Sequence, residues 1–273
     1  MYRYLVNSLL FFCCAAGLIN RNNNIIAASS VKTSALVRQL LAADDVHVPP
    51  NADQPGQPVR VNVGLQVAGV QHDRSESDLL ILHGFLDLRW ENSRLAWDPL
   101  QHHNITAVRL PADRVWVPDM TLYNSAFINS YDTRSRAVFP GERQLVSVRS
   151  DGTVMWIPRV TFPLSCNSTR NAAGDEVHCA IKLASWTYDA SQIDLRTWGD
   201  ITHRHDYSNL YSSRDSSYRI IDSTAVRNEV SYSCCPQAYP SIDITFTARS
   251  AAVSPLRLAW AAFILNSLLI IIR

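Results

Sequence analysis

The sequence is poor in glycine and lysine, and its only long apolar runs lie at its two ends. Of its 273 residues 9 are glycine, and Lys32 and Lys182 are the only lysines. Without internal apolar runs the chain cannot be a multi-span membrane protein. Its net charge of +1 and its lack of a basic run argue against a nucleic-acid-binding surface. A hydrophobic content of 47% argues against disorder, and the length fits one or two domains.

The motifs of common enzyme classes are also missing. There is no hydrolase elbow, phosphate-binding loop or dinucleotide-binding fingerprint. The carboxylates are scattered, so no pair is placed for general acid–base catalysis. His102 with His103, or His203 with His205, could share a metal, but no third ligand stands at a recognisable spacing. We therefore expect no enzyme activity, no cofactor and no metal site.

Residues 1–29 have the features of a secretory signal peptide. Arg3 precedes the apolar stretch Leu9–Ile19, and small residues that offer two cleavage sites follow. An N-terminal membrane anchor or a buried helix is the alternative. The sequons at Asn104 and Asn167 are glycosylation sites of the kind expected in a secreted chain.

Residues 250–273 form the second hydrophobic end. Leu258–Ile272 is apolar except at Asn266 and Ser267. As a helix it would be about 22 Å long, against a hydrocarbon core of about 30 Å. Small residues and a short spacer precede it, which suits a glycolipid-anchor signal. The first transmembrane helix of a truncated chain, or a buried core helix, is the alternative.

Between these ends the sequence predicts one domain, from about residue 30 to 249, that consists mostly of β-strands. The spacing of apolar residues predicts one short helix over 34–43. Alternation over Val59–Val67 predicts a half-buried strand, and the turn signal Ser150–Gly152 predicts a hairpin between 145–148 and 153–157. Further strands are expected at 181–183, 218–221, 226–232 and 242–246. The predicted fold is an antiparallel β-sandwich.

Four cysteines remain when the two in the signal peptide are set aside. An even number in a secreted chain predicts disulfides. Cys234 and Cys235 are adjacent and can be bridged only with a strained peptide geometry, so such a bridge is seldom a simple cross-link. Cys166 and Cys179 can pair readily with each other, which would leave Cys234 with Cys235. Two separate bridges to distant cysteines are the alternative.

Several motifs follow one another in an order typical of one family. The sequence resembles the ligand-binding domain of the Cys-loop neurotransmitter receptors, in particular the nicotinic family and the soluble acetylcholine-binding proteins. The resemblance covers roughly residues 35–247. The matching segments are Trp90–Pro99, Trp116–Asp119, Asp151–Pro158, the pair Cys166 and Cys179, Ser185–Tyr188, and Tyr232–Tyr239.

The resemblance implies an all-β, immunoglobulin-like antiparallel β-sandwich with a short N-terminal helix, assembled as a pentameric ring. Homo- or hetero-pentamers of related subunits would bind a small cationic neurotransmitter between neighbours, because aromatic faces attract a desolvated cation. The principal face would comprise Tyr123, Trp186, Tyr232, Cys234, Cys235 and Tyr239. The complementary face would comprise Phe85, Asp87, Ser147, Met155 and Ile157.

On the complementary face, Phe85 stands where the family usually has tryptophan. Asp87 would either attract a cation or remain a solvated carboxylate at the rim. Trp198, in a polar loop, is expected to tolerate replacement.

Two departures from the receptors concern channel activity. The bridged loop Asn167–His178 is polar, whereas the receptors have an apolar core there, so the loop resembles that of the soluble binding proteins. Lys182 matches a family lysine, but Ser241 occupies the position of its aspartate partner, and Asp243 is displaced by two residues. We expect an extracellular binding protein without its own pore, secreted or attached to the outer face of the plasma membrane through its tail. The alternative is a truncated subunit of a pentameric ligand-gated channel.

Overall fold

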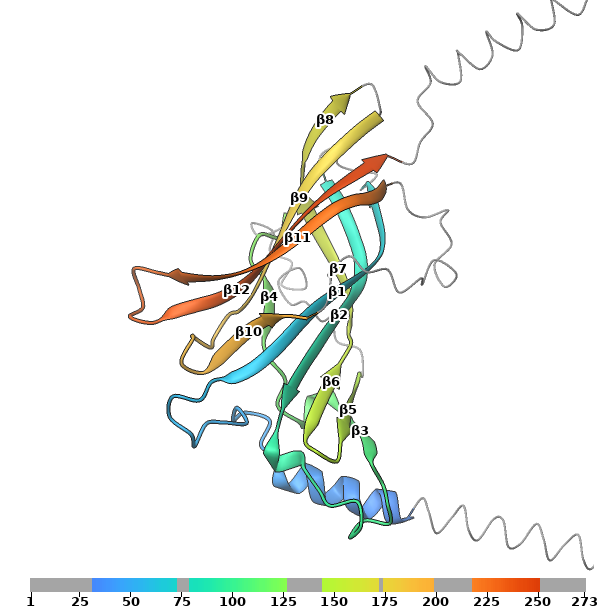
Figure 1. The fold of residues 1–273 in the computed structure, drawn as a ribbon, viewed down its shortest axis with the longest axis vertical. Coiled ribbons are helices and arrows are strands. Elements are labelled where there is room, and N and C mark those ends of the chain that lie inside the picture. Colours follow the sequence, from blue (N-terminus) through green and yellow to red (C-terminus); the bar gives the residue numbers. More distant parts are fainter. Residues whose placement is uncertain (1–30, 73–78, 127–143, 172–173, 199–217, 251–273) are drawn as a thin grey trace, which may run out of the picture.

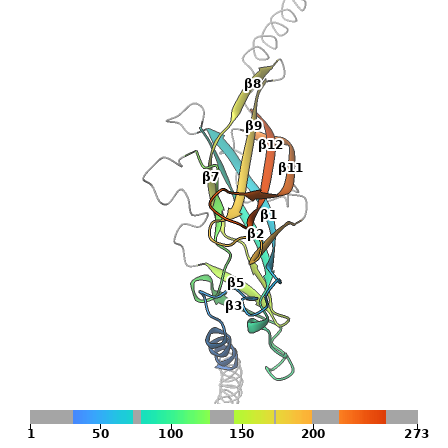
Figure 2. The same cartoon turned by 90° about the vertical axis from the view of Figure 1, so that its left-hand side faces the viewer.

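The fold of this chain was obtained as a computed structural model. It describes residues 31–72, 79–126, 144–171, 174–198 and 218–250 (Figure 1). The proposed signal peptide and the tail from residue 251 onward lie outside these residues. The described part is drawn out along one axis, with the N-terminal helix at one end and β8 (Asn167–Asn171) at the other (Figures 1 and 2).

Strands make up most of the described chain. A helix over residues 31–43 comes first, and two short 3-10 helices, η1 (Ser93–Leu95) and η2 (Ala112–Arg114), lie between strands. The other strands are β1 (Val59–His72), β2 (Leu79–Glu91), β3 (Ala107–Pro111), β4 (Met120–Leu122), β5 (Leu145–Arg149), β6 (Thr153–Trp156), β7 (Arg159–Ser165), β9 (Gly174–Ser185), β10 (Ile193–Thr197), β11 (Tyr218–Ser231) and β12 (Ala238–Ser250).

The strands pair in the order β3-β5-β6-β2-β1-β11-β12-β9-β4, with β10 beside β1, β7 beside β2 and β8 beside β9. Within the described residues only the pair β1–β10 is parallel. The predicted all-β class with one N-terminal helix is therefore confirmed.

Alternation along the strands separates the core from the outer surface. On β2 the inward residues are at most 2% exposed, and the odd-numbered residues from Phe85 to Arg89 point to the opposite face. These inward residues are Leu80, Leu82, Leu86, Leu88 and Trp90. One continuous core receives residues from both halves of the sheet order, which accounts for the sandwich.

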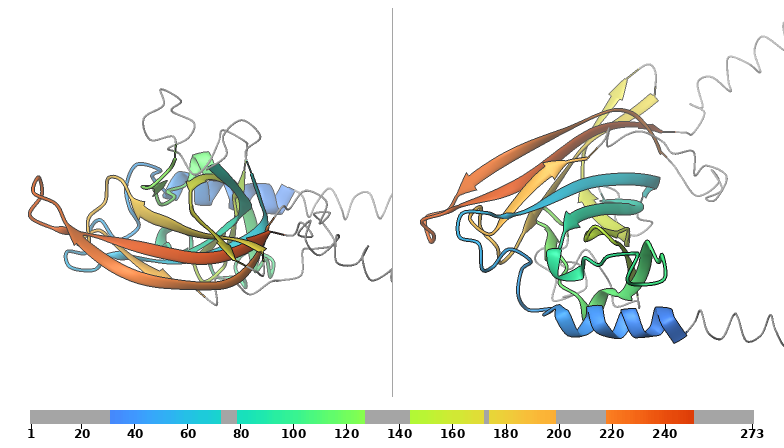
Figure 3. Two further views of the ribbon diagram at one scale, coloured as in Figure 1. Left: turned by 90° about the horizontal axis from the view of Figure 1, so that it is seen from above. Right: turned by 60° about the horizontal axis from the view of Figure 1, so that its bottom comes forward.

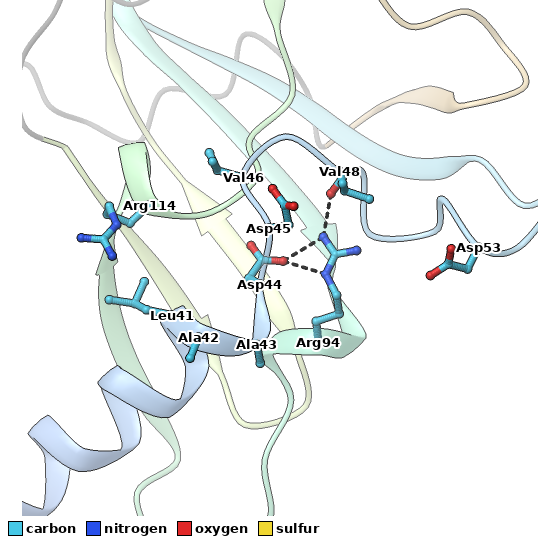
Figure 4. A pocket seen from close by; sticks show the side chains of 10 residues that line it. All are labelled: Leu41, Ala42, Ala43, Asp44, Asp45, Val46, Val48, Asp53, Arg94 and Arg114. Carbon is cyan, nitrogen blue, oxygen red and sulfur yellow. Dashed lines mark hydrogen bonds and ion pairs between the residues drawn. The ribbon is translucent and has the colours of Figure 1, made fainter.

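A buried carboxylate fixes the end of the N-terminal helix. The Asp44 side chain is 0% exposed, and its Oδ1 accepts hydrogen bonds from Arg94 Nε (2.8 Å) and Asn92 Nδ2 (3.0 Å). Its Oδ2 accepts from the backbone N–H of Trp116 (3.0 Å), and Arg94 also donates to the carbonyl of Val48 (2.7 Å). These bonds hold the segment after the helix against η1, beside an open cavity of about 490 Å³ (Figure 4).

The β11–β12 hairpin projects from the body of the domain (Figure 3). Towards its tip the hairpin is attached to β10 by Arg227, which donates to Asp194 Oδ1 and to the carbonyl of Leu195, each at 2.9 Å. The N–H of Ala190 also donates to the carbonyl of Ala238 (2.8 Å). The hairpin is therefore held as far as Ala238, the first residue of β12, and only the tip between Ser231 and Ala238 extends beyond these contacts.

Two segments differ from the elements that the sequence predicts. The strands predicted at 218–221 and 226–232 are the single strand β11, because a bulge between Ile220 and Asp222 lets pairing with β12 continue across the gap. The segment Asn167–His178, predicted as a loop, forms the paired strands β8 and β9. The helix begins at residue 31 instead of 34.

The predicted hairpin β5–β6 is confirmed, and its turn needs glycine. Gly152 has a positive φ of 84°, and a Cβ there would lie 2.7 Å from the carbonyl oxygen of Asn92. The structure also confirms the bridge Cys166–Cys179, and it pairs Cys234 with Cys235.

Replacing Asp44 by alanine should lower the free energy of unfolding by about 3 kcal/mol, because Arg94 would lose its buried partner. Asp53 lines the same cavity but is exposed, so Asp53→Ala is the matched control and should leave stability nearly unchanged. Urea denaturation measures both variants. Equal midpoints for the two would show that the Asp44 network does not stabilise the domain.

Candidate ligand-binding site

Four aromatic side chains gather where β4, β9 and the tip of the β11–β12 hairpin meet. Tyr123 and Trp186 lie edge to face, with ring centroids 5.6 Å apart. Tyr232 and Tyr239 flank the disulfide tip and are related in the same way, at 5.8 Å. Trp186 is 63% exposed, which is unusual for a tryptophan and leaves its ring open to a ligand. The structure therefore brings together the aromatic residues predicted for the principal face.

Tyr123 remains an uncharged phenol in this cluster. Burial, and after it the nearby Tyr232, Asp119 and Tyr239, raise the pKa of Tyr123 to about 12. Its hydroxyl donates to the carbonyl of Ser185 (2.6 Å). Lys182 Nζ lies 5.9 Å from the centroid of the Tyr123 ring, at the outer limit of a cation–π contact.

One carboxylate fixes the turn that carries Trp186. Asp119 Oδ2 accepts from the N–H of Trp186 (3.2 Å) and from the N–H and hydroxyl of Thr187 (2.8 and 2.7 Å). Its Oδ1 accepts from the hydroxyl of Ser185 (2.5 Å), which in turn accepts from the N–H of Tyr188 (2.8 Å). The carboxylate thus makes four hydrogen bonds to three consecutive residues.

Sequence reasoning used Asp119 only as part of a motif and assigned it no role. The available signal was an acidic residue that directly precedes β4 in the segment Trp116–Asp119. The turn also rests on aromatic residues. Trp116 donates from Nε1 to the Tyr188 hydroxyl (3.2 Å) and packs edge-on against the buried Trp90, with centroids 5.9 Å apart.

The residues predicted for the complementary face lie on one surface formed by β2, β6 and β5. Arg89 of β2 lies across from Met155 of β6, which lies across from Ser147 of β5. Phe85 and Asp87 point the same way as Arg89, and Ile157, directly after β6, is partly exposed. In the sheet order this surface and the aromatic cluster are on opposite sides of β1.

Asp87 is not a solvated carboxylate, so that alternative is wrong. It is 3% exposed and accepts two hydrogen bonds from Arg89, at 2.9 Å from Nε and 2.8 Å from Nη2. The Arg89 guanidinium lies 4.6 Å from the centroid of the Trp198 ring. The expectation that Trp198 tolerates replacement did not take this contact into account.

The other predicted positions are the two glycosylation sites, the position of the family lysine, and the candidate metal ligands. Asn104 and Asn167 are both exposed. Lys182 lies across from Asp243, which accepts from Asn228 Nδ2 (2.8 Å) and from the hydroxyl of Ser241 (2.9 Å). Within the described residues no group of three metal-ligating side chains is present, and His203 and His205 lie outside them.

The fold is a β-sandwich with a bridged hairpin, and its exposed aromatic cluster is a candidate ligand-binding site. Residues 33–250 match the family model of the neurotransmitter-gated ion-channel ligand binding domain, and the chain belongs to that family.

Similar proteins include the neuronal acetylcholine receptor subunit alpha-2 of Mus musculus, 29% identical over 195 residues. The acetylcholine receptor subunit alpha-type acr-16 of Caenorhabditis elegans is 32% identical over 190 residues. These matches cover 70% and 68% of this chain and 35% of each relative. The chain thus spans about a third of the length of these curated relatives. In the described ranges, no helix has the length and apolarity needed to cross a membrane.

Replacing Asp119 by asparagine should loosen the Trp186 turn, because one of the two oxygens becomes an N–H₂ group that cannot accept a hydrogen bond. Amide hydrogen exchange at Trp186 and Thr187 should accelerate about tenfold or more, while the amide of Val61 in β1 keeps its rate. Asp189→Asn is the matched control, since both hydrogen bonds from Ser191 reach a single oxygen, which asparagine retains. Unchanged exchange in Asp119→Asn would contradict the assigned role.

Proposed function

We propose that this domain binds acetylcholine or a similar cationic neurotransmitter outside the cell, at the interfaces of a pentamer. The observation that carries the proposal is the exposed Trp186 ring beside three tyrosines. Aromatic faces carry negative potential and attract a quaternary ammonium group, by about 2 kcal/mol or more in a desolvated site.

The surroundings of the cluster favour recognition through aromatic rings over an ion pair. The Asp119 carboxylate is occupied by four hydrogen bonds from the turn. Tyr123 is kept neutral by its raised pKa. A cation enclosed there would interact with ring faces and with no free carboxylate of the cluster, which suits a ligand that is charged but cannot donate strong hydrogen bonds.

A second chain would complete the site. The complementary face uses β2, β5 and β6, whereas the aromatic cluster uses β4, β9 and the β11–β12 hairpin. A neighbour that presents Phe85, Met155 and Ile157 to the cluster would exclude water and strengthen the attraction of the rings for a cation. Since one chain carries both faces, identical or related subunits would serve.

The polar character of the bridged β8–β9 hairpin supports a binding protein without its own pore, secreted or attached to the outer face of the plasma membrane. Its segment Asn167–His178 lacks the apolar core of the receptors' bridged loop. The alternative, a truncated subunit of a pentameric ligand-gated channel, is favoured by the relatives, which are receptor subunits about three times as long as the matched part. Expression of this chain alone distinguishes the two: a binding protein assembles and binds ligand without other subunits.

Trp186→Ala should weaken acetylcholine binding more than about thirtyfold, because it removes both the cation–π attraction and a large contact area. Trp186→Phe keeps a ring and should lose less. Calorimetry is the suitable measurement, since these variants alter the intrinsic fluorescence, and the oligomeric state of each is checked by light scattering. Wild-type affinity in a folded, assembled Trp186→Ala protein would refute the aromatic site.

Replacing Cys234 and Cys235 together by serine should weaken acetylcholine binding about tenfold while leaving a folded assembly, since the bridge shapes only the exposed hairpin tip. A serine pair at Cys166 and Cys179 is the comparison, because that bridge connects β7 to β9 and should affect stability more than affinity. Unfolding of the Cys234 and Cys235 double variant would assign the adjacent bridge a structural role instead.

A further inference from the structure

The complementary face carries more positive charge than a surface that receives a cation would be expected to have. Arg159 of β7 lies directly across from Phe85, and Arg109 of β3 lies across from Ser147. Both arginines are exposed. In the described part of the chain neither forms an ion pair with an acidic side chain.

Asp87 is the carboxylate at the centre of this face, and Arg89 neutralises it. The two hydrogen bonds from Arg89 are parallel and bidentate, the strongest geometry for such a pair. Glu91, further along the same face, lies at the end of β2 across from Thr153. Among the residues that the structure describes, none therefore presents a free negative charge at the centre of the face.

The ion pair is held in place by Trp198. The ring lies over the Arg89 guanidinium, and the N–H of Trp198 donates to the carbonyl of Val63 (2.9 Å). This approach depends on Gly64, because a Cβ there would lie 3.1 Å from the Trp198 carbonyl oxygen and 3.4 Å from its ring. Gly64 itself lies across from Asp87. Backbone and ring contacts thus fix Arg89 against Asp87.

We propose that Arg89 is a specificity-determining residue of the ligand site: by masking Asp87, it makes the complementary face admit ligands with one cationic group and disfavour ligands with a second. The inference rests on the proposed function, in which the first cationic group binds the aromatic cluster. The far end of such a ligand meets a neutral ion pair flanked by two arginines that have no acidic partner among the described residues. A neutral or electron-rich group is compatible with that environment, whereas a second ammonium group is repelled.

Removal of Arg89 would change the charge of this face in a different way from removal of Arg109 or Arg159. Loss of either flanking arginine deletes one positive charge from the edge of the face. Loss of Arg89 also exposes the charge of Asp87, which is buried and fixed in place. The sign of the centre of the face then changes from neutral to negative.

The test compares acetylcholine with succinylcholine, which joins two acetylcholine units tail to tail and carries two quaternary ammonium groups. Calorimetry on the purified full chain gives the affinity ratio of the two ligands. Wild type should prefer acetylcholine. In Arg89→Gln the ratio should shift toward succinylcholine by about tenfold, because the unmasked carboxylate attracts the second charge. Arg219→Gln, the same change on an exposed part of β11, should leave the ratio unchanged.

Two more variants keep the test decisive if Arg89→Gln does not fold. Asp87→Asn frees the charge of Arg89 and should shift the ratio further toward acetylcholine. The double variant Asp87→Asn with Arg89→Gln is neutral and should return close to the wild-type ratio. A ratio that stays at the wild-type value in the folded single variants, or a wild-type preference for succinylcholine, overturns this inference alone. Failure of the wild-type protein to bind either ligand overturns the proposed function and this inference together.

Discussion

Carboxylates that are removed from water must find hydrogen-bond donors, and this requirement fixes the main parts of the domain. Asp44 fixes the segment after the helix and Asp194 fixes the projecting hairpin to β10, and the half-buried Asp119 fixes the turn with Trp186 in the same way. Asp87 meets the same requirement with a partner on its own strand. In each case the donor is an arginine or a run of backbone N–H groups. The same contacts therefore satisfy the negative charge of the carboxylate and hold its segment in place.

The sequence predicted those features that short-range patterns encode. Alternation in β1 and the turn signal at Ser150–Gly152 predicted strands that the structure contains, because side-chain direction repeats every two residues in a strand. The four aromatic residues of the cluster were found by family resemblance, since nothing local relates Tyr123 to Tyr239. Periodicity alone would have predicted a β-sandwich with no site.

The missed features depend on contacts between residues far apart in the sequence. Trp198 reaches Arg89 across β1 only because Gly64 leaves room between them. The hydroxyl that donates a hydrogen bond to Asp119 belongs to Ser185, which lies 66 residues later in the sequence. The single strand β11 was divided in the prediction because the polar residues around Asp222 resemble a turn, whereas pairing with β12 satisfies their backbone groups.

The continuity of β11 also connects distant parts of the domain. Its 14 residues, at about 3.3 Å each, form a ribbon about 45 Å long together with β12. This ribbon is part of the larger sheet, because β12 also pairs with β9 from Ser241 to Arg249, and its ladder is irregular at the register shift between Ile220 and Asp222. The disulfide tip at Cys234 and Cys235 is therefore connected to the other bridged hairpin by continuous strand pairing that runs from β11 through β12 and β9 to β8.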